Sequence, residues 1–192
     1  MSDFLLFLGK FCRHGTRIAS LAPSSRWLAR ATLRDVDWDR AGVVVELGAG
    51  TGPITRLIAE LARPETRVVV LERDADFARL LRERFGHLAH FDVVEGDVRN
   101  LAAILRERGI DRVDAVISGL PVPSFPADLQ LDLFRVVRSV LAPGGHFSQI
   151  TEIPWVYQRL YRRFFREVRF AFEPRNFPPA GAYHCRGIKE VA

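Results

Sequence analysis

A carboxylate followed by three alternating glycines is the most informative pattern in the chain. Residues 46–53 read E-L-G-A-G-T-G-P and follow an apolar run at 43–45. Glycines between a strand and a helix let a ligand approach the backbone closely, as in nucleotide-binding turns. The spacing is G-x-G-x-G, and Pro53 stands where a dinucleotide fingerprint has its third glycine. A carboxylate at Glu46 suits a cationic ligand group better than a pyrophosphate.

Two further carboxylates follow the next two apolar runs. Glu72 comes directly after Leu71, where a carboxylate can accept both ribose hydroxyl protons. Asp97 follows the run that ends at Val94, where it can accept from an adenine amino group while the next amide donates to a ring nitrogen. Taken singly, Glu72 and Asp97 are also readable as surface charges or helix caps.

Together these residues predict a nucleoside cofactor with a cationic tail. S-adenosylmethionine, which carries a sulfonium and an ammonium group, fits this description. Arg73 is placed to flank the adenine. The predicted cofactor-binding residues are Glu46, Gly48, Ala49, Gly50, Thr51, Glu72, Arg73, Asp97 and Val98.

Alternating strand and helix patterns would hold these side chains at one edge of a sheet. Strand-like apolar runs lie at residues 43–47, 68–71, 91–94, 113–117 and 146–151. Helical patterns separate them at 53–62, 75–85, 101–108 and 129–141. This alternation predicts an α/β fold with a doubly wound parallel sheet. After Thr151 the pattern changes to a helix at 154–165 and strands at 167–172 and 182–190.

The first forty residues stand outside this alternation. At 100° per residue, a helix over 4–18 places Phe4, Phe7 and Phe11 on one face and Lys10 and Arg13 on another. Such a helix can lie in a membrane interface, with its rings among acyl chains and its cations near lipid phosphates. The alternative is a helix docked on the protein's own sheet.

Composition places the chain among folded proteins and leaves its partners open. Hydrophobic residues make up 48% of the 192 residues and charged residues 27%, which excludes a mainly disordered chain. The net charge of +5 comes almost entirely from arginine, since Lys10 and Lys189 are the only lysines. Arginine grips phosphate well, so nucleic acid and an anionic membrane are both candidate partners; a compositional habit of the source genome explains the bias equally well. Cys12 and Cys185 show no metal-ligand spacing, so no metal site is expected.

The motifs resemble those of class I S-adenosylmethionine-dependent methyltransferases. The first motif of that family, E/D-x-G-x-G-x-G, is matched by residues 46–52, and the resemblance extends over 41–192. It implies a Rossmann-like fold with a seven-stranded sheet, six strands parallel and one antiparallel. It also implies a methyltransferase domain at 41–192, with residues 1–40 as an amphipathic helix and a helical cap over the active site.

The fourth predicted strand ends in Ser118-Gly119-Leu120-Pro121, where this family binds its acceptor. Family members that methylate adenine carry an aromatic residue here, which stacks on the base. This chain has Val122 instead, and a base without that ring loses a contact of about 1 to 3 kcal/mol. The turn therefore disfavours nucleic acid and favours an aliphatic amine.

Three segments, at 22–29, 118–121 and 178–186, together resemble the bacterial phosphatidylethanolamine N-methyltransferases. The resemblance implies methylation of phosphatidylethanolamine to monomethyl and dimethyl forms at the membrane surface, with phosphatidylcholine as an open further product. It favours the interfacial interpretation of the helix at 4–18. It also implies a cytoplasmic location at the inner face of the cytoplasmic membrane, and we expect a monomer.

Residues near the C-terminus are candidates for holding the lipid head group. Tyr183 and Arg186 are predicted to grip its phosphate through a hydroxyl and a charge-assisted fork. His184 is a candidate proton acceptor for the amine, because its ordinary pKa lies near neutrality. Strand alternation places Tyr183 on one face and both His184 and Arg186 on the other, unless a bulge intervenes.

Two turns are predicted to complete the site. Carbonyls of Ser118 and Gly119 would orient the amine hydrogens, and Ser118 would also border the cofactor. Ser25 or Arg26 would close over the methionine carboxylate. The alternatives are an ordinary strand-end turn at 118–119 and a helix N-cap at Ser25.

Two other functions fit parts of the sequence. An rRNA adenine N6-methyltransferase would share the fold and the basic charge, but it would need an aromatic residue after the fourth strand. A non-catalytic membrane-binding module would keep the cofactor pocket as an S-adenosylmethionine sensor. Lipid N-methylation remains the leading hypothesis, because it accounts for the acceptor turn, the C-terminal segment and the amphipathic N-terminus together.

Overall fold

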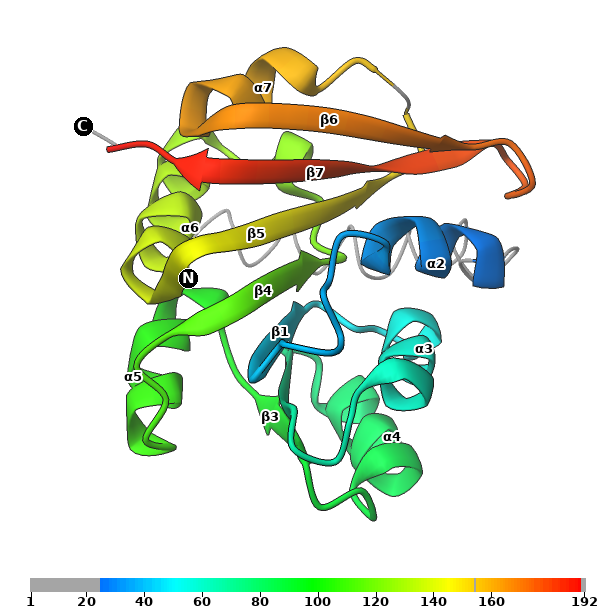
Figure 1. Ribbon diagram of the computed structural model, residues 1–192, viewed down its shortest axis with the longest axis vertical. Helices are drawn as coiled ribbons and strands as arrows, with labels where there is room; N and C mark the ends of the chain where they lie inside the picture. Colours follow the sequence, from blue (N-terminus) through cyan, green and yellow to red (C-terminus); the bar gives the residue numbers. More distant parts are fainter. Residues whose placement is uncertain (1–24, 154, 191–192) are drawn as a thin grey trace.

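The computed structural model describes residues 25–153 and 155–190 and contains one seven-stranded sheet, in the order β3-β2-β1-β4-β5-β7-β6 (Figure 1). The first five strands in this order pair in parallel, and β7 pairs antiparallel with both β5 and β6. Six strands therefore run one way and β7 the other, as expected for the predicted fold. The strands are β1 (Val43–Leu47), β2 (Arg67–Glu72), β3 (Phe91–Glu95), β4 (Val113–Ser118), β5 (Leu141–Thr151), β6 (Phe165–Glu173) and β7 (Ala180–Ile188).

The register of the parallel strands brings their carboxyl ends to one edge. Leu47 pairs with Leu71 on one side and with Ser118 on the other, and Ser118 pairs with Gln149. Loops that follow these residues therefore leave the sheet side by side. Parallel strands are buried on both faces, which explains why β1 and β2 appear in the sequence as unbroken apolar runs.

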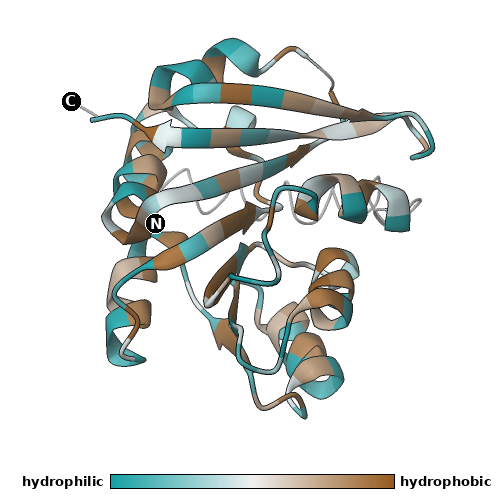
Figure 2. Ribbon diagram, in the orientation of Figure 1, coloured by the Kyte–Doolittle hydropathy of each residue, from teal (hydrophilic) through white to brown (hydrophobic). Residues whose placement is uncertain are grey.

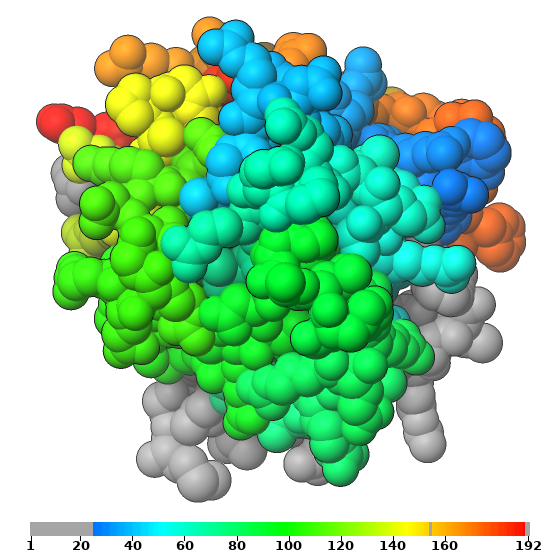
Figure 3. All heavy atoms as spheres, turned by 60° about the horizontal axis from the view of Figure 1, so that its bottom comes forward, coloured from blue at the N-terminus to red at the C-terminus, as the bar shows by residue number. Residues whose placement is uncertain are grey.

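Helices cover both faces of the sheet. One face carries α2 (Arg26–Leu33), α3 (Pro53–Leu61) and α4 (Ala75–Phe85), whose apolar residues pack with those of β1 and β2. The other carries α5 (Leu101–Glu107), α6 (Ala127–Val140) and α7 (Gln158–Phe164). The helices alternate between teal and brown in Figure 2, because each has one buried and one exposed side. Figure 3, in which the bottom of Figure 1 comes forward, shows the cyan and green segments, including α3 and α4, covering this side of the molecule. Two 3₁₀ turns, η1 (Val98–Asn100) and η2 (Val122–Ser124), follow β3 and β4.

An aromatic cluster fixes β5, β6 and β7 against the second helical layer. Phe134 stacks on Phe164 with ring centroids 4.1 Å apart and meets Phe147 and Phe165 edge-on, each at 5.5 Å. Tyr183 of β7 is also fully buried here. Aromatic pairs of this kind add about 0.5 to 1.5 kcal/mol each beyond the area they bury.

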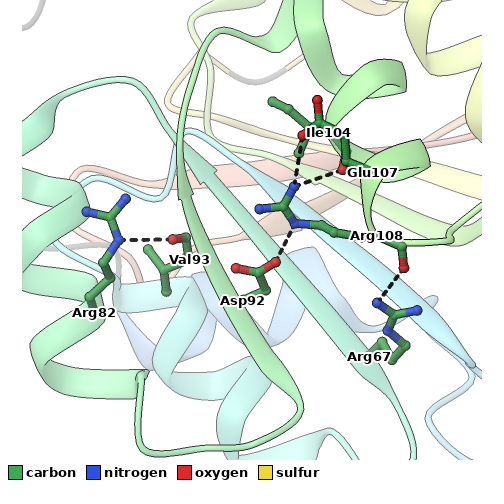
Figure 4. Close-up of polar contacts among 7 residues, drawn as sticks. All are labelled: Arg67, Arg82, Asp92, Val93, Ile104, Glu107 and Arg108. Atoms are coloured by element: carbon green, nitrogen blue, oxygen red, sulfur yellow. Dashed lines mark hydrogen bonds and ion pairs between the residues drawn. The ribbon is translucent and has the colours of Figure 1, made fainter.

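Arginine side chains cover the outer edge of β3 (Figure 4). Arg82 donates from Nε to the Val93 carbonyl at 3.1 Å. Arg108 pairs with the Asp92 carboxylate and donates from Nη1 to the Ile104 carbonyl at 2.9 Å. An edge strand has backbone groups without a neighbouring strand, and these contacts occupy part of that edge.

The predicted α/β fold and its seven-stranded sheet are confirmed; most boundaries lie within two residues of the prediction, and the larger differences are at the starts of β5 and α7. β5 begins at Leu141 rather than at residue 146, because its pairing with β4 continues through an irregularity around Pro143 and Gly144. α6 begins two residues earlier than predicted, and α7 begins at Gln158 rather than at residue 154. The predicted helix at 4–18 lies outside the described residues. Within the described part of the chain, no helix is long and apolar enough to cross a bilayer.

Candidate cofactor and acceptor site

The glycine turn lies between β1 and α3, at the edge where the parallel strands end. Gly48, Gly50 and Gly52 have φ angles of 71°, 56° and 82°, in the left-handed region that side-chain-bearing residues rarely adopt. Pro53 begins α3, where its missing N–H removes no helical hydrogen bond. The glycines are therefore required by the backbone conformation, and they leave the turn open to a ligand.

Glu72 ties the end of β2 to this turn. Its Oε2 accepts from the Gly50 amide at 2.8 Å, and its Oε1 accepts from the amides of Arg73 and Asp74 at 2.8 and 2.9 Å. A carboxylate has roughly four acceptor positions, so these three bonds leave about one, on Oε2. Glu72 thus holds the turn in shape, and the bidentate ribose contact expected from the sequence is reduced to one acceptor position.

Glu46 lies beneath the turn with only 1% of its surface exposed. Burial is the main cause that raises the pKa of this carboxyl to about 8; hydrogen bonding with Thr55 opposes the rise, and the neighbouring Glu72 contributes to it. Its Oε2 has no hydrogen-bond partner among the described residues. A buried polar atom without a partner is costly, and a cationic ligand would supply the missing interaction. The residues present therefore fit the ammonium and sulfonium groups of S-adenosylmethionine.

Asp97 and Val98 lie where β3 ends, the third strand tip of the predicted cofactor site. Asp97 caps η1 by accepting from the Arg99 amide at 2.9 Å, and it forms a fork with the Arg99 guanidinium at 2.9 and 2.8 Å. Burial works to raise the pKa of Asp97, but the Arg99 hydrogen bonds outweigh it and hold the pKa below its ordinary value. The helix-cap interpretation therefore describes Asp97, and its contact with adenine stays a prediction.

The acceptor turn after β4 touches the cofactor turn directly. The Gly119 amide donates to the Leu47 carbonyl at 2.8 Å. A Cβ atom at Gly119 would lie 2.5 Å from the Gly48 carbonyl oxygen, and one at Gly48 would lie 2.6 Å from Cδ2 of Leu120. Ser118 is fully buried at the end of β4. The structure thus brings Ser118 and Gly119 beside the cofactor turn, as the sequence predicts.

Gln149 of β5 bonds to this turn, and the sequence interpretation missed it. It is 1% exposed, and its Nε2 donates to the carbonyls of Leu120 and Ile150 at 2.8 and 3.0 Å. Its Oε1 has no partner among the residues that the structure describes. A polar side chain near the end of an otherwise buried strand was the available signal. Gln149 therefore fixes the acceptor turn through its bond to the Leu120 carbonyl.

Tyr183 is not placed to grip a phosphate. Its hydroxyl accepts from the Tyr157 amide at 3.0 Å, and the side chain packs between Tyr161 and Phe170 in the aromatic cluster. Burial raises the pKa of this hydroxyl. The sequence prediction is corrected here, because the antiparallel pairing of β5 and β7 turns Tyr183 into the core.

Arg186 and His184 also lie away from the site. Arg186 pairs with His146, three residues before Gln149 on β5, which is about 10 Å back from the edge at roughly 3.3 Å per residue. Its Nη1 donates to the Gly144 carbonyl at 3.1 Å. The continuous register also confirms that Tyr183 and His184 face opposite sides. The predicted phosphate grip is therefore not formed.

His184 belongs to a buried polar group under α2. Its Nδ1 lies 2.9 Å from the Ser148 hydroxyl and 3.9 Å from the Asp35 carboxylate, which also pairs with Arg169. Burial lowers the pKa of His184. With 3% of its surface exposed, His184 is not placed to take a proton from a bound amine.

Ser25 and Arg26 lie at the start of α2, and Arg26 lines a cavity together with Thr51 and Gly52 of the glycine turn. The Ser25 hydroxyl caps the helix by accepting from the Leu28 amide at 3.2 Å, and its own amide donates to Asn176 at 3.1 Å. Arg26 pairs with Glu60 of α3 at 2.9 Å. The N-cap interpretation describes Ser25, whereas a contact of Arg26 with the methionine carboxylate stays a prediction.

Comparison with known proteins agrees with this geometry. A family described as a methyltransferase domain matches residues 44–145. The ornithine lipid N-methyltransferase of Singulisphaera acidiphila is 71% identical over 190 residues, which cover 99% of each chain. The ribosomal RNA small subunit methyltransferase A of a Synechococcus species is 45% identical over 58 residues, and the match covers 30% of this chain and 20% of that one.

A solved structure shows the same fold. Precorrin 8w decarboxylase of Methanobacterium thermoautotrophicum superposes with a TM-score of 0.62 at 17% identity, covering 85% of this chain and 91% of the other. The family match includes the glycine turn, Glu72, Asp97 and the acceptor turn. The chain belongs to the class I S-adenosylmethionine-dependent methyltransferases, and S-adenosylmethionine is its cofactor.

Proposed function

We propose that the protein methylates the primary amine of an ornithine-containing membrane lipid. The observation that carries this proposal is the 71% identity to an ornithine lipid N-methyltransferase over 99% of both chains. The match to this relative extends over the acceptor turn as well as the cofactor turn. The matched ribosomal RNA methyltransferases share much shorter segments.

The acceptor turn supports an aliphatic amine. The residues after β4 carry no aromatic platform next to the turn, since Val122 follows Pro121 and is fully buried. The exposed Gly119 is in contact with the cofactor turn, so its carbonyl is the candidate for orienting the amine hydrogens. A small amine can reach this position without the stacking contact that a base requires.

The reaction needs little covalent help from the protein. S-adenosylmethionine supplies a methyl group activated by its sulfonium. The chain has to hold the amine about 3 to 3.5 Å from the reacting carbon and in line with the leaving sulfur. Gln149 fixes the Leu120 carbonyl, and Glu72 fixes the Gly50 amide, so both turns are held before substrates bind.

Phosphatidylethanolamine, expected from the sequence resemblance, is the competing substrate. Both head groups present a primary amine near an anion, which is a phosphodiester in one and a carboxylate in an ornithine lipid whose α-amine is acylated. The case for the phosphodiester rested on Tyr183 and Arg186, which lie in the core and about 10 Å from the sheet edge at roughly 3.3 Å per residue. The relative's substrate therefore takes precedence.

A competition assay tests the proposal. The full-length protein is incubated with labelled S-adenosylmethionine and mixed vesicles that contain equal amounts of ornithine lipid and phosphatidylethanolamine. We expect label in mono-, di- or trimethylated ornithine lipid, separated by thin-layer chromatography and identified by mass spectrometry. Label only in phosphatidylethanolamine would show that phosphatidylethanolamine, and not ornithine lipid, is the substrate. Cofactor binding with no lipid product would favour the sensor module. In a parallel reaction with 16S rRNA in place of vesicles, labelled RNA would favour the adenine methyltransferase.

A further inference from the structure

Large apolar side chains are exposed mainly at one end of the molecule. Of the seven that stand out among the described residues, six come from three segments: the first turn of α2, the loop from β5 to α7 and the end of the β6–β7 hairpin. The seventh, Leu61, lies at the end of α3. We call these six the apolar rim: Trp27, Ile153, Trp155, Val156, Phe172 and Phe177, of which Phe177 is 83% exposed. Single exposed apolar residues are ordinary, but a gathering of them marks an interaction surface.

Side-chain contacts join the three segments. The Trp155 ring lies 4.9 Å from the Phe172 ring between centroids. The Arg175 guanidinium of the hairpin lies 3.9 Å above the Trp27 ring, and the Ser25 amide is bonded to Asn176. Figures 1 and 3 both show the start of α2 beside the orange hairpin. The apolar rim is therefore one surface.

Trp155 is held outward at a cost in backbone conformation. Its φ angle is 62°, in a region that bulky residues rarely adopt. Its ring is half-exposed while resting on Phe170 and Phe172. Strain of this kind persists where the surrounding structure enforces it, and such positions cluster at binding surfaces.

The apolar rim continues the strand that supports the acceptor turn. Gln149, within β5, bonds to Leu120. Two residues later Thr151 ends the strand, and its hydroxyl bonds to the Ile153 amide and carbonyl at 3.1 and 3.2 Å. The rim thus starts at the edge of the sheet where the cofactor and acceptor turns lie.

Charges around the apolar rim favour an anionic partner with an apolar interior. Arg30 lies 5.8 Å from the Trp27 ring, and Arg159 is exposed at the start of α7. Within the described ranges, neither has a carboxylate within 4.0 Å, whereas Arg175 is neutralised by Glu173 and Glu152 is an exposed acid beside Ile153. Tryptophan and arginine next to apolar side chains are the residues that bind at the headgroup level of a bilayer.

We propose that the apolar rim docks the protein on an anionic lipid bilayer and so presents the acceptor turn to lipid head groups. The inference rests on the proposed function, because a lipid substrate is what a bilayer surface supplies. It assigns docking to a surface of the folded domain, in addition to any role of residues 1–24. The two other possible occupants, a second copy of the chain and the segment 1–24, make different predictions in the experiment below.

The test compares two full-length variants in a vesicle sedimentation assay. Trp155→Ala/Phe177→Ser removes two rim side chains, and Leu61→Ser is the matched control that removes an exposed apolar residue elsewhere. Vesicles contain phosphatidylcholine alone or with 30% phosphatidylglycerol. We expect wild type and Leu61→Ser to bind the anionic vesicles equally. The rim variant should bind about tenfold more weakly, since it lacks two apolar side chains that the bilayer would bury. Equal thermal unfolding of all three excludes misfolding.

An activity assay separates docking from catalysis. On ornithine lipid in vesicles, we expect the rim variant to turn over at least fivefold more slowly than wild type. On a short-chain ornithine lipid dissolved as monomers, the two should be equal, because the rim is not part of the reacting site. No turnover of either substrate by wild type, with rim-dependent vesicle binding intact, would refute the proposed function and leave the docking surface standing.

Three results would overturn the docking proposal. Vesicle binding by the rim variant that equals or exceeds wild type would show that the surface is not used or is covered by segment 1–24. A concentration-dependent dimer of wild type that the rim variant loses, measured by light scattering, would assign the surface to a second copy. A Trp155 emission that is unchanged by anionic vesicles, measured in a Trp27→Phe/Trp38→Phe background, would place the ring outside the bilayer.

Discussion

The cofactor half and the acceptor half of the site differ in what fixes their shape. At the ends of β1 and β2, backbone conformation does most of the work, since three glycines adopt positive φ and Glu72 binds amide groups. At the ends of β4 and β5, side-chain packing and strand register decide, through Leu120 against Gly48 and Gln149 beneath Leu120. The cofactor half should therefore tolerate few substitutions, whereas the acceptor half can change its substrate by exchanging side chains.

The largest effect is expected where the halves meet. In Gly119→Ala, the new Cβ would lie 2.5 Å from the Gly48 carbonyl oxygen, so the two turns must move apart. Ordinary contact needs a separation of about 3.4 Å, so the turns must move by about 1 Å, and a misplacement of about 1 Å lowers kcat/KM about 100-fold. Gly42→Ala is the control, because neither Gly119 nor Gly42 has a positive φ, and a Cβ at Gly42 would lie in ordinary contact, 3.5 Å from Oδ2 of Asp114, at the opposite end of β1. Wild-type turnover by Gly119→Ala would show that the halves work independently.

Within the cofactor half, Glu72→Gln should weaken cofactor binding. The amide group has one acceptor oxygen instead of two, so at least one of three bonded amides loses its partner. Hydrogen bonds to charged groups contribute about 1.5 to 3 kcal/mol, so we expect the calorimetric Kd for S-adenosylmethionine to rise at least tenfold. The exposed Glu83 of the same region, changed to Gln, should bind as wild type does.

Within the acceptor half, Gln149→Leu should lower turnover while leaving cofactor binding nearly intact. The Leu120 carbonyl would lose its buried donor, at a cost of about 1 to 3 kcal/mol. We expect kcat to fall about tenfold, with the Kd for the cofactor changed less than twofold. A Kd that rises as much as kcat falls would contradict the division into two halves.

Glu46 predicts a pH dependence of stability. Its carboxyl pKa is about 8 in the folded protein and 4.5 ordinarily, so the folded state binds more protons between these values. The contribution of Glu46 to the free energy of unfolding is therefore fully present below pH 4.5 and is lost as pH rises toward 8. The free energy of unfolding should fall by up to about 1.4 kcal/mol per pH unit in this range. Glu46→Gln should remove this slope in urea unfolding measured from pH 5 to 8. The same slope in the variant would assign it to other groups.

The smallest effect is expected for Arg186→Ala. The side chain bonds to Gly144 and lies about 10 Å back from the site at roughly 3.3 Å per residue, so kcat/KM for the lipid should change less than twofold. Steady-state kinetics with vesicle substrate measure this directly. A loss of tenfold or more would restore the sequence interpretation of Arg186 as a head-group ligand.

The sequence was sufficient to place the cofactor half, because its information is local, whereas the ligand contacts of Glu72 and Asp97 stay predictions. Glycine spacing, a carboxylate at the end of each strand and the strand–helix alternation are all visible within short windows, and the sheet follows from them. The positions of Tyr183 and Arg186 were predicted wrongly, because they depend on the register in which β7 pairs with β5. A shift of register changes both the height and the face of a side chain, and neighbouring residues do not reveal it. Gln149 was visible as a polar residue near the end of a buried strand, but its bond to Leu120 depends on the register between β4 and β5.

The arginine contacts at the edge of β3 suggest a structural reason for the arginine-rich composition of the chain. Arginine side chains also donate to backbone carbonyls elsewhere, and among the described residues seven act in this way: Arg63, Arg67, Arg82, Arg84, Arg108, Arg112 and Arg186. A planar guanidinium can bind a carbonyl with one N–H and keep others for water or a carboxylate, which an ammonium does less well. Part of the positive charge thus serves to hold loops to strands. The isoelectric point alone is therefore a poor guide to what the protein binds, and the position of each arginine decides whether it can contact a partner.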